Sequence, residues 1–289
     1  MLASPSELTY FIALAKTLNF SRAAELIGIS QPSLSLAIQR LEQKLEIQLF
    51  NRTKYQVHLT PGGQALLTHA NKLINYWEMT KYEVTAAEHG INGVITLGCP
   101  DSITAYLLMK FLPNLIAANP NLKLELEHGN SQRILDKVVD FSLQLGIVVN
   151  PPPHPDLIIN KLYQDKTTFW RSVQHQHLNL QSQHSAIICN PQVRQTQWLL
   201  KYLHKNNISY ARLITTDNYE LIANMVIDGC GIGIAPKTIM LSKGANKVEE
   251  IPNLASYKDH ICLIHRQEFH SLKLVQKLIA IISAQLEQT

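Results

Sequence analysis

Long hydrophobic runs are missing from this chain of 289 residues. No stretch reaches the roughly 18 consecutive apolar residues that a membrane-spanning helix needs. The first residues, Met1 to Pro5, carry neither the basic nor the apolar region of a secretory signal peptide. We therefore expect a cytoplasmic protein without a membrane partner.

Cysteine is scarce, and the few cysteines form no pattern. The four are Cys99, Cys189, Cys230 and Cys262. They are scattered without Cys-x-x-Cys spacing, which is typical of reduced, mostly buried thiols in a cytosolic protein.

Signatures of catalysis are absent as well. The chain has no Gly-x-Ser-x-Gly elbow, no phosphate-binding P-loop and no His-Glu-x-x-His motif. The histidines at 175, 177, 184 and 204 lack the i, i+4 pairing of a zinc site, so we interpret them as surface residues. We expect no enzyme, no cofactor and no metal.

The composition is that of a folded and mildly basic protein. The chain is 46% hydrophobic, with a formal net charge of +4 and an isoelectric point of about 8.8. It is too long for one compact core, so we expect two or three domains. The charge is compatible with nucleic acid, but the basic excess of the N-terminal part is modest. Useful DNA affinity would therefore need two copies.

The stretch over residues 20–60 organises the chain. Ser21 can cap a short helix whose small face is Ala23-Ala24 and whose apolar anchor is Leu26. Gly28 can adopt the left-handed backbone that ends this helix.

A second helix follows the turn. Ser30 can be its N-cap, because Pro32 is tolerated in a first turn where no intrahelical donor is lost. Its apolar stripe consists of Leu34, Ile38, Leu41 and Leu45. Its other side carries the hydrogen-bonding residues Gln31, Ser33, Ser35, Gln39 and Arg40. Two short helices joined by a tight turn, the second polar outward, are typical of a helix-turn-helix.

Two further elements complete this N-terminal part. A helix over 6–18 should bury Leu8, Phe11, Leu14 or Ala15, and Leu18 against the two helices. The segment over 52–60 predicts a short two-stranded wing whose polar side chains contact phosphates.

Thr60-Pro61 begins a long helix that we expect to end near His89. About 28 residues at 1.5 Å each give a rod of roughly 40 Å. A heptad-like seam runs along it through Leu66, Ala70, Leu73, Trp77, Thr80 and Val84. The seam could pack on the chain's own C-terminal part, but we favour a partner helix from a second subunit.

Strands and helices alternate from Gly93 onward. Two strand–helix–strand–helix–strand patterns, over 94–149 and 186–235, predict two parallel-sheet lobes with a ligand cleft between them. Between these patterns we expect two separate strands, over 157–161 and 167–173. A strand over 261–264 and a final helix over 271–288 follow. If that helix completes the first lobe, the chain crosses between the lobes twice.

These residues resemble the LysR-type transcriptional regulators over nearly the whole chain. The specific motifs are Ser21-Arg-Ala-Ala-Glu-Leu26, Ile29-Ser-Gln-Pro-Ser-Leu-Ser35, Leu41-Glu-Gln-Lys-Leu45, Leu49-Phe-Asn-Arg-Thr53 and Leu59-Thr-Pro-Gly-Gly63. Looser matches occur at Ile95–Gly98, Pro120–Leu122, Leu145–Ile147 and Val226–Pro236.

The resemblance implies a fold class and a domain division. An N-terminal all-α winged helix-turn-helix and a long linker helix would precede a C-terminal two-lobed α/β domain resembling periplasmic binding proteins. The DNA-binding domain would span 1–60, the linker and dimerisation helix 61–90, and the effector-binding domain 91–289. Lobe I would comprise about 91–165 and 266–289, and lobe II about 166–265.

The resemblance also implies a function and a set of partners. The protein would be a homodimer or homotetramer, joined through the 61–90 helix and the effector domains. It would bind an inverted-repeat operator in double-stranded DNA and a small-molecule effector, and a contact with RNA polymerase is compatible with this role. The DNA-binding residues would be Ser21, Arg22, Ser30, Gln31, Pro32, Ser33, Ser35, Gln39, Arg40, Arg52, Thr53 and Lys54.

Leu36 departs from the family pattern, which commonly has arginine just after the second serine of the recognition helix. Arginine reads guanine through a bidentate fork, whereas glutamine favours adenine. The polar residues of the helix, Gln31, Ser33, Ser35 and Gln39, must then carry more of the base readout. A ligand-binding module with weakened DNA recognition is therefore an alternative.

Three loops lead from a strand into a helix within the expected lobes: 99–102, 129–131 and 215–218. Backbone N–H groups and helix dipoles there suit a carboxylate or another small polar ligand. The candidate effector-binding residues are Cys99, Pro100, Asp101, Ser102, Asn130, Ser131, Thr215, Thr216 and Asp217. Asp101 and Asp217 argue against a strongly anionic ligand, and the hydroxyl residues could equally be ordinary N-caps.

Cys99 leaves one further alternative, an enzyme. A thiol just before a helix N-terminus can have a lowered pKa. A nucleophilic Cys99 would also need a histidine base, and the sequence identifies none.

Overall fold

The computed structural model describes residues 3–53, 56–89, 93–120, 122–180, 185–270 and 272–286. The chain forms two compact units, Met1–Val94 with Asp136–Gln144, and Ile95–Leu135 with Leu145–Thr289. No helix in the described part of the chain combines the length and apolarity that crossing a bilayer requires.

The first unit begins with three short helices and a two-stranded wing. These elements are α1 (Pro5–Thr17), α2 (Phe20–Ile27), α3 (Gln31–Leu45), β1 (Phe50–Arg52) and β2 (Val57–Leu59). The strands pair antiparallel, as expected for a wing. Leu34, Ile38 and Leu41 of α3 are fully buried in one core with Phe11 of α1, whose ring lies 5.4 Å from that of Phe50.

The ends of these helices differ from the sequence-based expectation. The N-cap of α2 is Asn19 rather than Ser21, because Asn19 Oδ1 accepts a 3.0 Å hydrogen bond from the Arg22 backbone N–H. Leu18 is 40% exposed rather than buried, because it ends α1 in the left-handed conformation. Leu45, the last residue of α3, is also 40% exposed. Leu26 is 67% exposed and does not belong to the core of this unit, which α2 joins through the buried Ala23 and Ala24 and the partly buried Phe20 and Ile27.

α4 (Pro61–His89) runs over the expected range. Ala70, near its start, is fully buried in the core of the first unit, and Leu66 packs against the same core. Farther along, Leu73, Trp77 and Val84 are 57%, 48% and 65% exposed. The later part of the seam is therefore uncovered in the single chain.

The second unit is built on one large mixed sheet. Its elements are β3 (Gly93–Cys99), α5 (Asp101–Ala118), β4 (Leu122–His128), α6 (Ser131–Val139), β5 (Leu145–Val149), β6 (Leu157–Ser172), a 3-10 turn (Val173–His175), β7 (Ala186–Cys189), α7 (Arg194–Lys205), β8 (Arg212–Thr215), α8 (Tyr219–Ile227), β9 (Gly231–Pro236), α9 (Lys237–Ser242), β10 (Val248–Glu250), β11 (Tyr257–Arg266), a 3-10 turn (Gln267–Phe269) and α10 (Lys273–Leu286). The described strands follow the order β4-β3-β5-β11-β6-β9-β7-β8, with β10 on β6.

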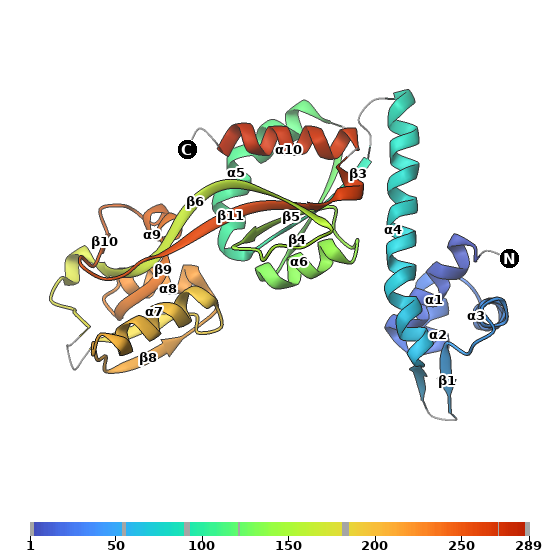
Figure 1. Ribbon diagram of the computed structural model, residues 1–289, viewed down its shortest axis with the longest axis horizontal. Coiled ribbons are helices and arrows are strands. Elements are labelled where there is room, and N and C mark those ends of the chain that lie inside the picture. Colours follow the sequence, from blue (N-terminus) through green and yellow to red (C-terminus); the bar gives the residue numbers. More distant parts are fainter. Residues whose placement is uncertain are drawn as a thin grey trace. The chain divides into compact units, whose positions relative to one another are not determined.

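Two long central strands, β6 and β11, join the two lobes of this sheet (Figure 1). At one end β11 pairs antiparallel with β5, and at the other end β6 pairs antiparallel with β9. The flanking pairs β3–β5, β7–β9 and β7–β8 are parallel, as the sequence patterns predict. α10 packs on α5, so the end of the chain returns to the first lobe and the backbone crosses between the lobes twice.

The sequence-based account of these crossing strands is wrong in detail. β6 is one continuous strand of 16 residues, not two. The polar run between Lys161 and Lys166 looked like a loop, but antiparallel pairing with β11 keeps it extended. β11 is likewise longer than expected, and α9 and β10 were not predicted.

Candidate functional site

α3 presents a polar surface that its own N-terminus holds in place. Ser30 caps the helix by accepting a 3.3 Å hydrogen bond from the Ser33 backbone N–H, and the two hydroxyl oxygens lie 2.8 Å apart. Gln31, Pro32, Gln39 and Arg40 are exposed, and Ser35 is half-buried. The buried stripe therefore fixes the rotation of α3 and leaves its amide and guanidinium groups accessible.

Basic side chains beside this surface differ in how they are engaged. Ser21 and Arg22 are exposed on α2, and neither Arg22 nor Arg40 has an ion-pair partner among the described residues. Arg52 Nη2 instead lies 3.0 Å from Glu42 Oε2, with the guanidinium 4.9 Å from the Phe20 ring centroid. Arg52 thus links the wing to α3 through Glu42. Only the guanidinium N–H groups that do not contact Glu42 remain for a phosphate.

Thr53 and Lys54 are the other two predicted DNA-contacting residues of this segment. Thr53 is exposed, and its Oγ1 both accepts from the Gln56 backbone N–H at 3.1 Å and donates to the Gln56 carbonyl at 3.2 Å. Lys54 lies outside the described residues.

Glu42 positions the wing, a role that the sequence analysis missed. Its Oε1 accepts backbone hydrogen bonds from Leu49 at 2.8 Å and Phe50 at 3.2 Å, while Oε2 holds Arg52. Glu42 and Arg52 are ten positions apart in the chain. This separation matches neither helical nor strand periodicity, so sequence patterns could not reveal the contact.

A cavity of about 960 Å³ lies between the two lobes of the second unit. The starts of five helices line it: α5, α6, α7, α8 and α9. Sequence reasoning identified three of these, the starts of α5, α6 and α8. Helix N-termini offer unpaired N–H groups and a positive dipole end, so this geometry favours a ligand with a negative or strongly polar group.

The predicted effector-binding residues divide into two sets. Those that line the cavity are Pro100, Asp101, Asn130, Ser131 and Asp217. Asn130 Oδ1 accepts from the Arg133 backbone N–H at 2.8 Å, and Ser131 Oγ accepts from the Val149 backbone N–H at 3.0 Å, so both are partly occupied. The structure does not place Cys99, Thr215 or Thr216 among the lining residues. The side chain of Ser102 lies outside the described part of the chain.

Local contacts explain why three of the predicted residues do not line the cavity. Cys99 is 1% exposed beneath the start of α5. Thr215 is exposed at the end of the edge strand β8, and Thr216 Oγ1 accepts from the Asn218 backbone N–H at 3.2 Å. The N-cap of α8 is Asn218, whose Oδ1 accepts from the Leu221 backbone N–H at 3.1 Å.

Asp259 also lines the cavity and was not predicted. It is 2% exposed and accepts three hydrogen bonds, from Thr167 Oγ1 at 2.6 Å, Asn150 Nδ2 at 2.8 Å and Gln195 Nε2 at 2.9 Å. Asp165 is its partner across the β6–β11 ladder. Burial raises the pKa of Asp259, and the negative charge of Asp165 raises it further.

The charge of the cavity is predominantly negative. Of the described residues that line it, five carry carboxylates, Asp101, Asp165, Asp217, Glu220 and Asp259, whereas Arg194 carries a guanidinium. Glu220 is already engaged, because it accepts from the Tyr106 hydroxyl and pairs with Lys243. The other carboxylates leave a surplus of negative charge that a purely anionic ligand would not neutralise.

The environment of Cys99 disfavours the thiolate form that a nucleophile needs. Burial, and to a lesser degree the charge of Asp101, raise the pKa of its thiol to about 12. The reactive thiolate is therefore suppressed at neutral pH.

Comparisons with known proteins agree with both halves of this architecture. The family described as "Bacterial regulatory helix-turn-helix protein, lysR family" matches residues 5–64, and the "LysR substrate binding domain" matches residues 88–287. The chain belongs to the LysR family of transcriptional regulators. As a LysR-type regulator it is a DNA-binding protein with an effector-binding domain, and not an enzyme.

Individual LysR-type proteins are similar over most of the chain. CysL, a transcriptional regulator of Bacillus subtilis, is 25% identical over 237 residues, which cover 80% of this chain and 79% of CysL. The crystal structure of ArgP from Mycobacterium tuberculosis is 14% identical with a TM-score of 0.75, and covers 99% of this chain and 98% of that one. Full-length CbnR, solved in complex with its target DNA, is 19% identical with a TM-score of 0.64, covering 99% of each chain. At these identities the two structures show a common fold.

Proposed function

We propose that this LysR-type regulator binds an inverted-repeat operator sequence-specifically through paired copies of α3. The observation that carries the proposal is the exposed polar face of α3, together with the exposed guanidinium groups of Arg22 and Arg40. The amide groups of Gln31 and Gln39 have the chemistry to read adenine edges, and the arginines to hold phosphates. A cytoplasmic location and a contact with RNA polymerase are part of the same proposal.

The active species is proposed to be a homodimer or homotetramer. The exposed Leu73, Trp77 and Val84 on α4 support a partner helix there, since an isolated apolar seam gains from burial. Met109 and Ile116 on α5, which are 59% and 56% exposed, support a second contact through the effector domains.

The effector is proposed to be a small polar molecule bound in the cavity between the lobes. Its carboxylate would meet the N-terminus of a helix such as α5 or α6. The carboxylates of Asp165 and Asp259 then require a cationic group at the other end, so a zwitterion of amino-acid type fits better than a simple acid. Closure of the lobes on this ligand would alter the spacing of the two recognition helices.

The domain division belongs to this proposal as well. We divide the chain into residues 1–60, 61–90 and 91–289, because α4 begins at Pro61. Lobe II would end near residue 260 rather than 265, because Ile261–His265 pair with β5 of lobe I.

Operator binding is tested by gel shift against the region upstream of the protein's own gene and by selection of bound genomic fragments. We expect discrete, salt-sensitive complexes on half-sites about one helical turn, or a multiple of it, apart. Failure to form any discrete complex at moderate salt, with and without metabolites, would contradict the proposal.

A ligand-binding module with weakened DNA recognition is the second candidate. It is favoured by Leu36, whose side chain is 47% exposed on α3 where arginine would supply a guanine contact. Intact oligomerisation and ligand binding, with no site recovered from random DNA, would support this candidate instead.

A further inference from the structure

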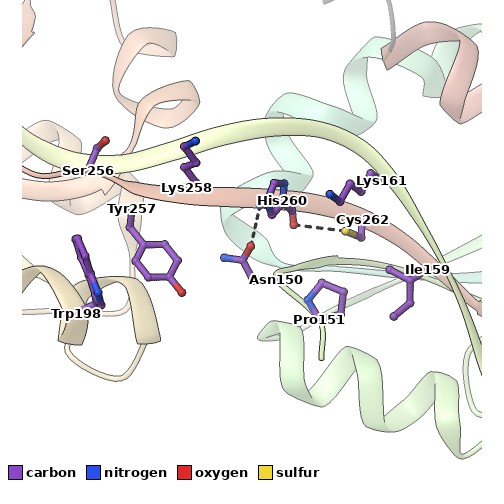
Figure 2. Close-up of a pocket in the computed structure, with 10 residues that line it drawn as sticks. All are labelled: Asn150, Pro151, Ile159, Lys161, Trp198, Ser256, Tyr257, Lys258, His260 and Cys262. Carbon is purple, nitrogen blue, oxygen red and sulfur yellow. Dashed lines mark hydrogen bonds between the residues drawn. The ribbon is translucent and has the colours of Figure 1, made fainter. Parts of the chain in front are cut away.

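A second groove, of about 610 Å³, lies against the crossing strands β6 and β11 (Figure 2). Successive strand residues point to opposite faces. On β11, Asp259 and Ile261 line the cavity between the lobes, whereas Lys258, His260 and Cys262 line the groove.

β6 changes face at a β-bulge. Its pairing with β11 shifts between Tyr163, opposite Ile261, and Lys161, opposite Cys262. Residues before the bulge, Ile159 and Lys161, consequently line the groove, and Tyr163 beyond it lines the cavity between the lobes. The bulge thus separates the residues of β6 that line the groove from those that line the cavity between the lobes.

The charge of this groove is opposite to that of the cavity. Lys161, Lys258 and His260 line it, and none of the described lining residues is acidic. Within the described part of the chain neither lysine ammonium has an ion-pair or hydrogen-bond partner. Lys166, opposite Lys258 in the ladder, is by contrast held by Glu250 at 2.6 and 2.8 Å.

An aromatic wall closes one end of the groove. Figure 2 shows Trp198 and Tyr257 at that end, and Ile159 and Cys262 at the other. The rings of Trp198 and Tyr257 meet edge to face, with centroids 5.5 Å apart. Trp198 is 44% exposed, so part of its ring is accessible to a ligand.

We propose that this groove is a second ligand site, which binds an aromatic carboxylate. The ring of the ligand would stack against Trp198 and Tyr257, and its carboxylate would meet the lysine ammonium groups. The proposal does not depend on operator binding or on the identity of the ligand between the lobes.

Asn150 gives such a ligand a route to the first site, because it lines both depressions. Its Nδ2 donates to Asp259 Oδ1 at 2.8 Å, and its Oδ1 accepts from the His260 backbone N–H at 2.8 Å. A ligand against Asn150 therefore contacts a side chain that also lines the cavity between the lobes. Binding at one face would change affinity at the other.

Salicylate is a suitable probe, with the neutral salicyl alcohol for comparison, in titration calorimetry on the full-length protein without DNA. We expect one salicylate per chain and no measurable binding of the alcohol. The double variant Lys161→Gln/Lys258→Gln should weaken salicylate binding about tenfold or more, since two charge-assisted contacts are lost. The charge-matched control Lys205→Gln/Lys247→Gln removes two exposed lysines that line neither depression, and should bind like the wild type.

Two further variants locate the bound salicylate. Trp198→Ala should weaken binding, whereas Asp101→Asn, which changes a residue of the cavity between the lobes that does not line the groove, should leave it within about twofold. No binding of salicylate at millimolar concentration, equal binding by the alcohol, or an equal loss in the two lysine double variants would overturn the proposal. Because DNA is absent from the titration, none of these outcomes bears on the operator.

Discussion

Lys44 on α3 donates two hydrogen bonds of 2.8 Å, one to each carboxylate oxygen of Glu7 on α1. Glu7 also accepts from the Ser4 backbone N–H at 2.8 Å, as the second half of a capping box. The contact with Lys44 is the largest cause of the lowered pKa of Glu7. The pair joins the first helix to the recognition helix.

A pH dependence of the first unit follows from this pair. Because the pKa of Glu7 is lower in the folded chain than in the unfolded one, its contribution to stability is fully present above the unfolded value, about 4.3. That contribution disappears as the pH falls through the folded pKa. Glu7→Gln should lower stability at pH 7 by about 1 kcal/mol and reduce the loss seen on acidification. Thermal unfolding from pH 7 to pH 3 measures both effects, and parallel curves for the two proteins would contradict the assignment.

Gly62 and Gly63 at the start of α4 should respond differently to alanine. A Cβ on Gly63 would lie 2.2 Å from the Leu49 carbonyl oxygen, a backbone atom whose group also accepts from the Thr60 backbone N–H. On Gly62 the nearest atom would be the flexible Ile47 Cδ1, at 2.7 Å. Gly63→Ala should therefore cost about 2 kcal/mol or more, and Gly62→Ala clearly less. Chemical unfolding of the two variants provides the comparison, and equal losses would rule out the backbone contact as the cause.

Local sequence patterns predicted those elements whose contacts join residues close in sequence. The bounds of α4 and the buried stripe of α3 follow from caps and helical spacing, which depend on neighbouring residues alone. Leu26 was misjudged because periodicity does not tell which apolar residue of a short helix reaches the core.

The crossing strands could not be predicted in the same way. Asp165 and Asp259 come together only through the β6–β11 ladder, which joins segments far apart in the chain. Their polar neighbours resemble a loop until that pairing is known. The three helix starts at the cavity could be predicted because each depends on neighbouring residues. The acidic wall of the cavity could not, because it depends on the pairing of β6 with β11.

Gln31 and Arg40 should have different roles at the DNA. Gln31→Ala should weaken binding to the selected operator by about 1–3 kcal/mol and relax specificity at one base pair, because an amide contact to a base edge is lost. Arg40→Gln should weaken binding to all sequences and reduce the salt slope by about 1. Affinities measured at several salt concentrations on operator and scrambled DNA separate the two. A loss of specificity from the Arg40 variant alone would reverse the assignment.

Trp77→Glu should dissociate the oligomer. The side chain is 48% exposed in the single chain, so a new charge there should not disturb the fold of the chain. At an interface between subunits the same charge would be buried, which is costly. Sedimentation should show a smaller species, and operator affinity should fall sharply because two recognition helices no longer act together. Glu78→Gln, on the same helix, changes a residue paired with Lys81 at 2.7 Å and is the control. An unchanged sedimentation coefficient for the tryptophan variant would place the interface elsewhere.

Asp259→Asn should make the protein more stable but less able to bind its effector. Because burial raises the pKa of Asp259 in the folded chain, the folded state binds more protons than the unfolded state between the ordinary value and the raised one. Stability therefore falls as pH rises through this window. Asparagine can keep all three contacts, since the Thr167 hydroxyl can accept as well as donate. The variant should unfold at a higher temperature than the wild type at pH 7, and the difference should vanish below the ordinary pKa.

The same substitution tests the charge of the effector. A thermal-shift screen can pair each compound that carries an ammonium group with an analogue that lacks it, such as alanine with lactate. We expect the stabilising compounds to carry the ammonium group, and Asp259→Asn to weaken their binding about tenfold or more, because a charge-assisted contact is lost in a buried site. Gln132→Glu, which adds a charge to another lining residue, should not weaken the binding of these compounds. Hits that are purely anionic and insensitive to Asp259→Asn would show that the helix N-termini outweigh the carboxylates in selecting the ligand.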